Sequence, residues 1–225
     1  MPGRRHAAPS TRTRVRREPE RGRYDRETVD AILDAALVCH LGFVQDGQPF
    51  VIPTLHARVG DEVLIHGSSA SRALRVAGAA TPVCLTVTLL DGIVLARSVF
   101  EHSVNYRSVM VLGEATPVTG EAEKLAALEA LTERLLPGRW ADARRPTRTE
   151  LKATAVLRLP LDEASAKVRT GPPADGDTPD AELDVWAGVI PLVTRALAPQ
   201  PDPMLRPGVP VPAYAERYHR DGLTG

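Results

Sequence analysis

The sequence predicts a mainly β fold with flanking helices, in which antiparallel strands close, or nearly close, into a barrel. Short β-branched runs recur every ten residues or so and are separated by Asp-Gly and Gly-Asp turns, a pattern typical of barrels and sandwiches. Two longer segments instead repeat apolar residues with the helical period. Apolar residues make up 43% of the 225-residue chain, enough to bury a sizeable core. We therefore expect one large domain with terminal tails.

The first half of this domain is expected to begin with a helix and to continue as a hairpin. Asp25 is suited to cap a helix, because the apolar residues from Val29 to Leu37 follow helical spacing. Asp46-Gly47 favours a hairpin turn, and Pro53 in the second strand implies a bulge or a position that needs no N–H group. The predicted elements are a helix from Asp25 to Leu37, strands over 38–44, 50–59 and 62–66, and a short helix over 71–79.

The second half contains further strands and one long amphipathic helix. Asp91-Gly92 has the composition of a turn, so we expect it to separate two strands. Leucines recur at helical spacing from Leu125 to Leu136. The predicted elements are strands over 82–89, 92–100, 104–118, 155–160 and 167–169, and helices over 121–136 and 147–154.

Three regions are distinguished by composition. Residues 1–23 carry eight arginines and three prolines, which predicts a disordered basic arm that is either a solvated tail or a contact for an acidic surface. Residues 24–198 form the folded domain, in which 171–184 is rich in Pro, Asp and Gly and predicts a flexible loop. Residues 199–225 form a Pro-rich extension that is expected to lie extended over the surface.

Several classes of protein are disfavoured. Lys plus Arg equals Asp plus Glu at 28 each, which argues against a nucleic-acid partner held by global charge. No apolar run approaches the ~20 residues of a membrane span, and the N-terminus lacks the apolar core of a signal peptide, so we expect a cytoplasmic protein with no membrane partner. Cys39 and Cys84 have no CxxC spacing and are expected to be buried. The histidines show no metal-ligand spacing, so no metal site is predicted.

The best local candidate for chemistry is the run from His66 to Arg72, His-Gly-Ser-Ser-Ala-Ser-Arg. A strand ends there, a hydroxyl-rich turn follows, and a helix begins with an arginine. Hydroxyl groups and a guanidinium fork suit a phosphate, although a serine-rich turn also serves simply to cap a helix. The sequence contains no P-loop, GxGxxG or GxSxG motif.

The chain resembles the pyridoxamine 5'-phosphate oxidase-like flavoproteins, and within them the flavin-nucleotide-binding branch that includes nitroimidazole-resistance proteins. The resemblance extends over residues 22–215. The motifs that carry it are the segments 25–41, 48–54, 66–72, 103–108 with Gly113, 137–140, 166–171 and 185–189.

This resemblance implies an FMN-binding split β-barrel over residues 24–198, and a homodimer with FMN at the subunit interface. The strand Phe50–Thr54 would lie along the flavin ring, and the turn Gly67–Ser71 would hold the phosphate together with Arg72. Trp186 would approach the flavin from the partner subunit. The implied cofactor residues are Val51, Ile52, Pro53, Thr54, Gly67, Ser68, Ser69, Ser71, Arg72, Tyr106, Ser108, Lys167 and Trp186, with Arg169 as a further contact.

The function implied is that of an FMN-dependent oxidoreductase that moves electrons between a small reductant and an unidentified small molecule. No catalytic acid or base is identified. The end Pro-Val-Pro-Ala-Tyr replaces the Arg-His set of the vitamin B6 oxidases, which argues against that substrate. The alternative is a carrier or sensor without turnover, which binds flavin, haem or a deazaflavin. A third reading has the basic arm tethering the barrel to nucleic acid.

Overall fold

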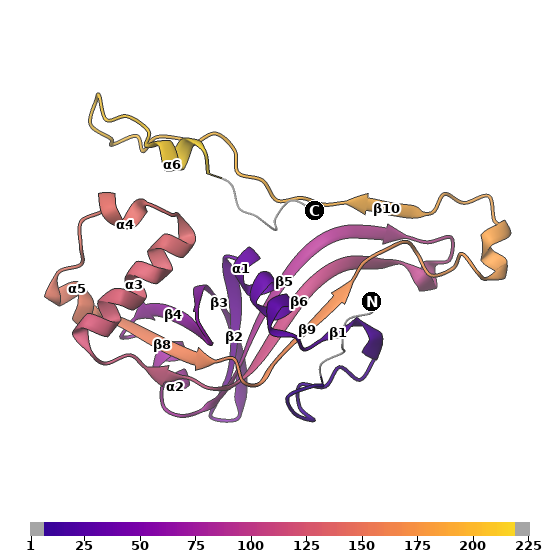
Figure 1. The fold of residues 1–225 in the computed structure, drawn as a ribbon, viewed down its shortest axis with the longest axis horizontal. Helices are drawn as coiled ribbons and strands as arrows, with labels where there is room; N and C mark the ends of the chain where they lie inside the picture. The colour runs from indigo at the N-terminus through magenta and orange to yellow at the C-terminus, as the bar shows by residue number, and fades with distance from the viewer. Residues whose placement is uncertain (1–6, 219–225) are drawn as a thin grey trace.

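The computed structural model describes residues 7–218, and within them ten strands join one antiparallel sheet (Figure 1). The order is β1-β9-β6-β5-β2-β3-β4-β8-β7, with β10 on β5. This confirms the predicted antiparallel β fold with flanking helices, in the arrangement of a split barrel.

The strands are β1 (Gly22–Arg23), β2 (Val38–Gln45), β3 (Gln48–Val59), β4 (Glu62–Ser68), β5 (Pro82–Leu95), β6 (Ser103–Glu114), β7 (Thr116–Pro117), β8 (Thr154–Pro160), β9 (Ala164–Arg169) and β10 (Gly188–Pro191). The helices are α1 (Arg26–Ala35), α2 (Arg72–Ala77), α3 (Glu121–Leu135), α4 (Arg139–Asp142), α5 (Arg148–Ala153) and α6 (Ala213–Glu216), with 3-10 turns η1 (Pro19–Arg21), η2 (Val99–Glu101) and η3 (Pro179–Glu182).

Strand β3 joins the two halves of the barrel. Its first part pairs with β2 as far as Leu55, and from His56 onward it pairs with β4. The core between the halves is aliphatic, and its central leucines Leu33, Leu41 and Leu85 are at most 2% exposed. Burying one such side chain contributes about 1.5–3 kcal/mol. A smaller apolar cluster lies beneath α3 around Leu131.

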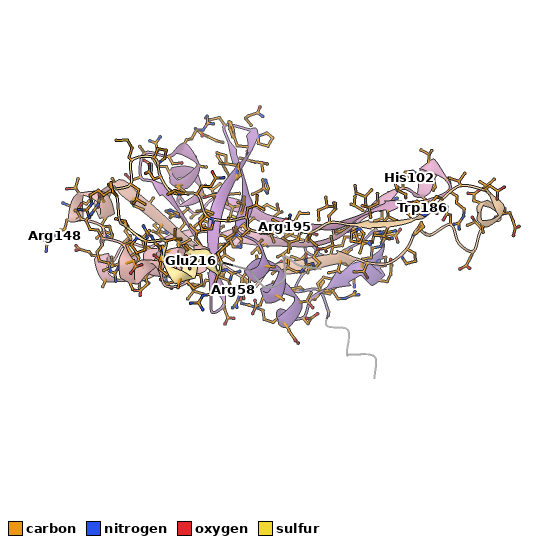
Figure 2. All side chains as sticks on the ribbon, turned by 90° about the horizontal axis from the view of Figure 1, so that it is seen from above. Arg58, His102, Arg148, Trp186, Arg195 and Glu216 are labelled. Carbon is orange, nitrogen blue, oxygen red and sulfur yellow. The ribbon has the colours of Figure 1, made fainter. Side chains whose placement is uncertain are left out.

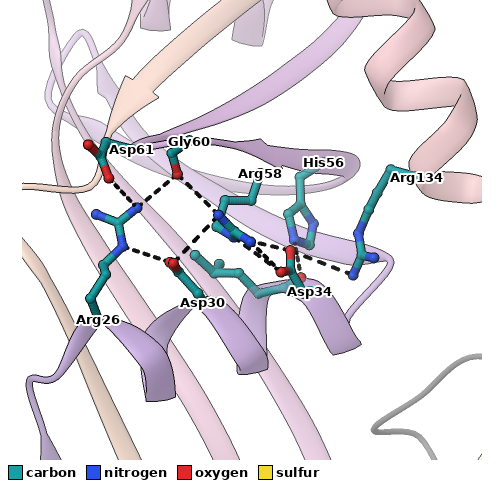
Figure 3. Close-up of polar contacts among 9 residues, drawn as sticks. Arg26, Asp30, Asp34, His56, Arg58, Gly60, Asp61 and Arg134 are labelled. Atoms are coloured by element: carbon teal, nitrogen blue, oxygen red, sulfur yellow. Dashed lines mark hydrogen bonds and ion pairs between the residues drawn. The ribbon is translucent and has the colours of Figure 1, made fainter.

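Helix α1 is fixed to β3 by a network of ion pairs (Figure 3). Arg58 of β3 donates to both oxygens of Asp34 at 2.5–3.2 Å and lies 3.5 Å from Asp30. Arg26 at the start of α1 bonds Asp30 at 2.7 Å and reaches the turn after β3. The buried His56 ring lies 3.0 Å from the Leu33 carbonyl oxygen. These contacts connect one helix to the strand on which the candidate site lies.

The prediction of a turn at Asp91-Gly92 is wrong. β5 runs unbroken from Pro82 to Leu95, and the two residues form a bulge where its register with β6 shifts. Asp91 is used in a two-pronged ion pair with Arg107 of β6, at 2.7 and 2.9 Å. A Cβ at Gly92 would lie 3.1 Å from the Ile190 carbonyl oxygen. Glycine at this position therefore allows β10 to approach β5 closely, and it does not form a turn.

Two further boundaries differ from prediction. Residues 96–102 leave the sheet as a loop with η2, so the expected strand 92–100 ends at Leu95. The expected strand 104–118 is interrupted at Ala115, after which β7 pairs with β8. The chain changes partner there because Ala115 and Val118 turn into the interior, at 1% and 3% exposure. The helices expected over 121–136 and 147–154 are confirmed as α3 and α5.

The basic segment 1–23 is structured over the residues described. Thr13 is 1% exposed, and the N–H of Val15 donates to the Tyr24 hydroxyl at 2.8 Å. Strand β1 pairs with β9 through Gly22 and Lys167. The structure therefore differs from the expected disordered arm over residues 7–23, because this segment finds hydrogen-bond partners on the sheet; residues 1–6 lie outside the described part.

The C-terminal segment returns from the end of the β5–β6 hairpin to the barrel (Figures 1 and 2). β10 pairs along the projecting end of β5, and residues 192–212 form no helix or strand. At the barrel, Tyr214 donates its hydroxyl to Asp142 of α4 at 2.6 Å and accepts from Arg139 at 3.1 Å. No helix among residues 7–218 has the length and apolar character needed to cross a membrane.

Candidate functional site

The turn after β4, which the sequence predicts as a phosphate site, is held by its own hydrogen bonds. The N–H of Ser71 donates to the Ser68 carbonyl at 2.9 Å. The N–H of Ser69 donates to the Ala153 carbonyl at 2.8 Å. The Oγ of Ser68 accepts from the N–H of Ala70, so this side chain shapes the turn. The hydroxyl of Ser71 makes no capping bond to α2, which leaves it and the exposed Ser69 hydroxyl to face a ligand.

Arg72 lies at the first position of α2, with its guanidinium over an aromatic ring of β3. Its central carbon is 4.1 Å from the centre of the Phe50 ring. Phe50 in turn stacks on the buried Phe43 with 5.4 Å between ring centres. This support restricts an exposed arginine to one region of space. Phe50 belongs to the strand that is predicted to lie along the flavin ring, but it is not among the residues predicted to bind the cofactor.

The four residues predicted to line the flavin ring divide between two faces of β3. Val51 is 67% exposed and Pro53 is also exposed, on the face opposite the core. Ile52 packs against the core beside Phe50, and Thr54 is half-buried on that same side. A planar ligand that lies against one face of β3 can therefore touch the side chains of Val51 and Pro53, or those of Ile52 and Thr54, but not all four.

His66 and Gly67 connect the core to the turn. The Nδ1 atom of His66 is buried and has no hydrogen-bond partner among the described residues. Burial lowers the pKa of His66, so its ring is neutral near pH 7. A Cβ at Gly67 would lie 3.0 Å from Leu74 of α2, and glycine thus permits the close approach of the helix.

Tyr106 and Ser108 lie on β6 and Lys167 lies on the paired strand β9, so the structure brings these three residues close together; their contact with a cofactor stays a prediction. Ser108 is opposite Lys167 in the register and donates its hydroxyl to the Lys167 carbonyl at 3.2 Å. Tyr106 is opposite Arg169. The guanidinium of Arg169 is buried and bonded to Asn105, whereas Lys167 is only half-buried and is the more accessible cation of the pair.

Trp186 lies away from the turn, at the far end of the projecting hairpin beside His102 (Figure 2). It is 67% exposed. A Cβ at Gly188 would lie 2.9 Å from its ring, so the indole rests on the backbone of β10. The prediction of a flavin contact from the partner subunit therefore stays a prediction, and within one chain Trp186 and Arg72 do not form one site.

The two thiols are unsuited to redox chemistry. Cys39 and Cys84 are both free. Burial raises the pKa of Cys39 to about 12 and also raises that of Cys84, so both are protonated near neutral pH. Among residues 7–218 no three His, Cys, Asp or Glu side chains are placed to hold a metal ion.

Comparisons with known proteins agree with this arrangement. The chain is similar to a flavocytochrome from Azotobacter vinelandii, at 46% identity and a TM-score of 0.90 over 95% of this chain and 99% of that one. It is also similar to a FAD- and haem-binding protein from Mycobacterium smegmatis, at 40% identity and a TM-score of 0.83 over 91% and 98% of the two chains. A putative 5-nitroimidazole antibiotic resistance protein from Bacteroides thetaiotaomicron shares the fold, at 21% identity and a TM-score of 0.55 over 65% and 86%.

A search of curated proteins found no match. The sequence profile described as pyridoxamine 5'-phosphate oxidase matches residues 25–168, a range that contains the turn, Arg72 and the β6–β9 residues. This confirms the resemblance stated from the motifs. The chain belongs to the pyridoxamine 5'-phosphate oxidase-like family of flavin-binding proteins.

Proposed function

We propose that this chain binds a flavin and a haem and acts as an oxidoreductase that passes electrons between them. The observation that carries the proposal is the likeness to two proteins, a flavocytochrome and a FAD- and haem-binding protein, at 46% and 40% identity over nearly the whole chain. The expectation from sequence was FMN with haem as an alternative. We now propose that flavin and haem bind together, with FMN or FAD as the flavin.

The turn after β4 fits the flavin phosphate. Arg72 offers a guanidinium fork held on Phe50, and the hydroxyls of Ser69 and Ser71 face outward beside it. The unpartnered Nδ1 of His66 lies immediately before the turn, where a polar atom of a ligand would satisfy it. These groups would bind and orient the anion, and the guanidinium of Arg72 can donate two parallel hydrogen bonds to a phosphate.

A second copy of the chain completes the site in this proposal. The chain exposes 14288 Å², against roughly 10,000 Å² for a compact monomer of this mass. At the end of the projecting hairpin, Val99 and Phe100 are 86% and 88% exposed. Apolar side chains this exposed are typical of an interface. A homodimer would bring the hairpin end of one subunit, with Trp186, to the barrel of the other.

The haem requires an axial ligand, for which the described chain offers two exposed histidines. His40 lies on β2 between Val38 and Val44, which are 45% and 52% exposed. His102 follows the apolar residues of η2 at the hairpin end. An accessible imidazole within an apolar surface is the combination that haem binding needs. The buried His56 is held to the Leu33 carbonyl and serves the core instead.

When bound, the flavin would supply two-electron chemistry and the haem one-electron chemistry. The chain's own residues would hold the phosphate, through Arg72 and the hydroxyls of Ser69 and Ser71. Small-molecule donors and acceptors are the expected partners.

The test is reconstitution of the purified full-length protein with FMN, FAD, a deazaflavin and haem, each followed by absorption spectroscopy. We expect a flavin band and a Soret band on the same protein, and photoreduction of the flavin without oxygen should then reduce the haem. His40→Ala and His102→Ala, made separately, should show which one removes the Soret band. A protein that takes up neither flavin nor haem would refute the proposal. Uptake of both without reduction of the haem would favour a carrier or sensor.

A further inference from the structure

A cavity of 430 Å³ lies between the N-terminal segment and the outer face of β5, β6 and β9. Four cationic side chains line it: Arg14, Arg16 and Arg17 from the segment, and Lys167 from β9. The hydroxyl-bearing residues Thr86 and Thr88 of β5 line the opposite wall. The cavity is thus a concave surface lined by four cationic residues and by hydroxyl-bearing residues.

Among residues 7–218, no carboxylate lines this cavity. The nearby acidic residues of the described chain are engaged elsewhere. Glu163 accepts from Ser10 at 2.5 Å and lies 3.8 Å from Arg12. Glu20, which feels the charge of Lys167, is exposed and ion-paired with Arg21 at 3.7 Å. Glu20 thus offsets part of the charge of Lys167, and the charge of the three arginines is left for a ligand to balance.

The segment that carries the arginines is held in place without any ligand. Thr13, directly before Arg14, is buried and hydrogen-bonded to Ser10. Val15 is fixed through its N–H to the Tyr24 hydroxyl. Folding of the segment already brings four like charges close together. An anion would therefore be attracted to them without the entropic cost of ordering the chain first.

We propose that this cavity binds the phosphoryl group of a small molecule. A doubly charged phosphate matches arginine forks and hydroxyl donors better than a single carboxylate does. Val15 and Met110 supply apolar surface for the body of the ligand. The site is separate from the turn that holds Arg72, since the residues of that turn do not line it. The inference does not depend on the identity of the flavin or on haem.

Calorimetric titration of the full-length protein with sodium pyrophosphate tests this site. We expect saturable binding, and the variant R16Q/R17Q should weaken it about tenfold or more, because hydrogen bonds to charged groups are involved. R12Q is the matched control, since Arg12 lies on the same segment but outside the cavity; it should bind as the unaltered protein does. Circular dichroism of both variants would establish that they are folded.

Repeating the titration on protein loaded with FMN, FAD or haem identifies the source of the phosphate. If FAD alone blocks pyrophosphate, the cavity holds a phosphate of the dinucleotide; if none blocks it, the ligand is a separate phosphorylated compound. Both results support an anion site. Absence of saturable binding, or equal binding by R16Q/R17Q and R12Q, would overturn it. Pyrophosphate binding by a protein that takes up no cofactor would refute only the proposed function.

Discussion

Replacing Arg72 with alanine should weaken flavin binding while leaving the fold intact. Arg72 is exposed, and its guanidinium contacts the Phe50 ring at 4.1 Å. Loss of a charged hydrogen bond to phosphate costs about 1.5–3 kcal/mol, and exposure to solvent places this site at the lower end of that range. We therefore expect a loss of about tenfold in flavin affinity.

The ring contact makes a second, separate contribution. An exposed cation–π contact is worth about 0.5–1 kcal/mol, which lowers the stability of the unliganded protein rather than its affinity. Arg72→Lys keeps the charge but loses the planar fork, so it should fall between the alanine variant and the unaltered protein. Comparing the two variants thus separates charge from geometry.

The assay is titration of apoprotein into FMN or FAD, followed by quenching of flavin fluorescence. The control is Arg75→Ala, since Arg75 lies on the same helix one turn later and is also exposed. Its flavin affinity should equal that of the unaltered protein. If Arg72→Ala binds flavin as tightly as Arg75→Ala does, the phosphate does not lie at this turn and the reasoning fails.

Three further predictions concern the fold, a thiol and the dimer. Arg58→Leu removes a partly buried pair with Asp34, so unfolding free energy should fall by about 1 kcal/mol and Tm by roughly 2–4 °C in calorimetry; an unchanged Tm would contradict this. Cys39 has a pKa near 9 when unfolded and about 12 when folded, so its contribution to stability is complete below pH 9 and is lost as pH rises toward 12. Urea unfolding should show this decline, and Cys39→Ala should reduce it. Phe100→Asp should weaken the proposed homodimer about tenfold or more, since burial of one such ring is worth about 1.5–3 kcal/mol; sedimentation that shows no change would place the interface elsewhere.

Local signals were sufficient for most of the barrel. Asp25 caps α1 as expected and accepts from the N–H of Thr28, because capping depends on neighbours in sequence. The hairpin at Asp46-Gly47 likewise formed where it was predicted, between β2 and β3. Asp91-Gly92 has the same composition but became a bulge. Its partners, Arg107 and β10, are distant in sequence, so no local rule could distinguish the two cases.

The candidate site was predicted in part. The serine-rich turn and Arg72 follow each other in the chain, and a motif of seven residues therefore revealed them. Phe50 lies on another strand, and its contact with Arg72 depends on how β3 packs against α2. Strand periodicity predicts that Val51 and Ile52 lie on opposite faces of β3. The set of ring contacts implied by the resemblance did not take this alternation into account.

By itself, the sequence determined the family, the antiparallel fold and the position of the serine-rich turn that we propose to hold a phosphate, because these depend on periodicity and on motifs of adjacent residues. The tertiary structure alone decided where the arginine-rich segment lies over residues 7–23. Its composition indicates a solvated tail, yet Thr13 is buried and Arg14, Arg16 and Arg17 face Lys167 across one cavity. A cationic site built from residues some 150 positions apart arises only when β9 and the segment pack together, since charge counts along a chain carry no information about distance in space.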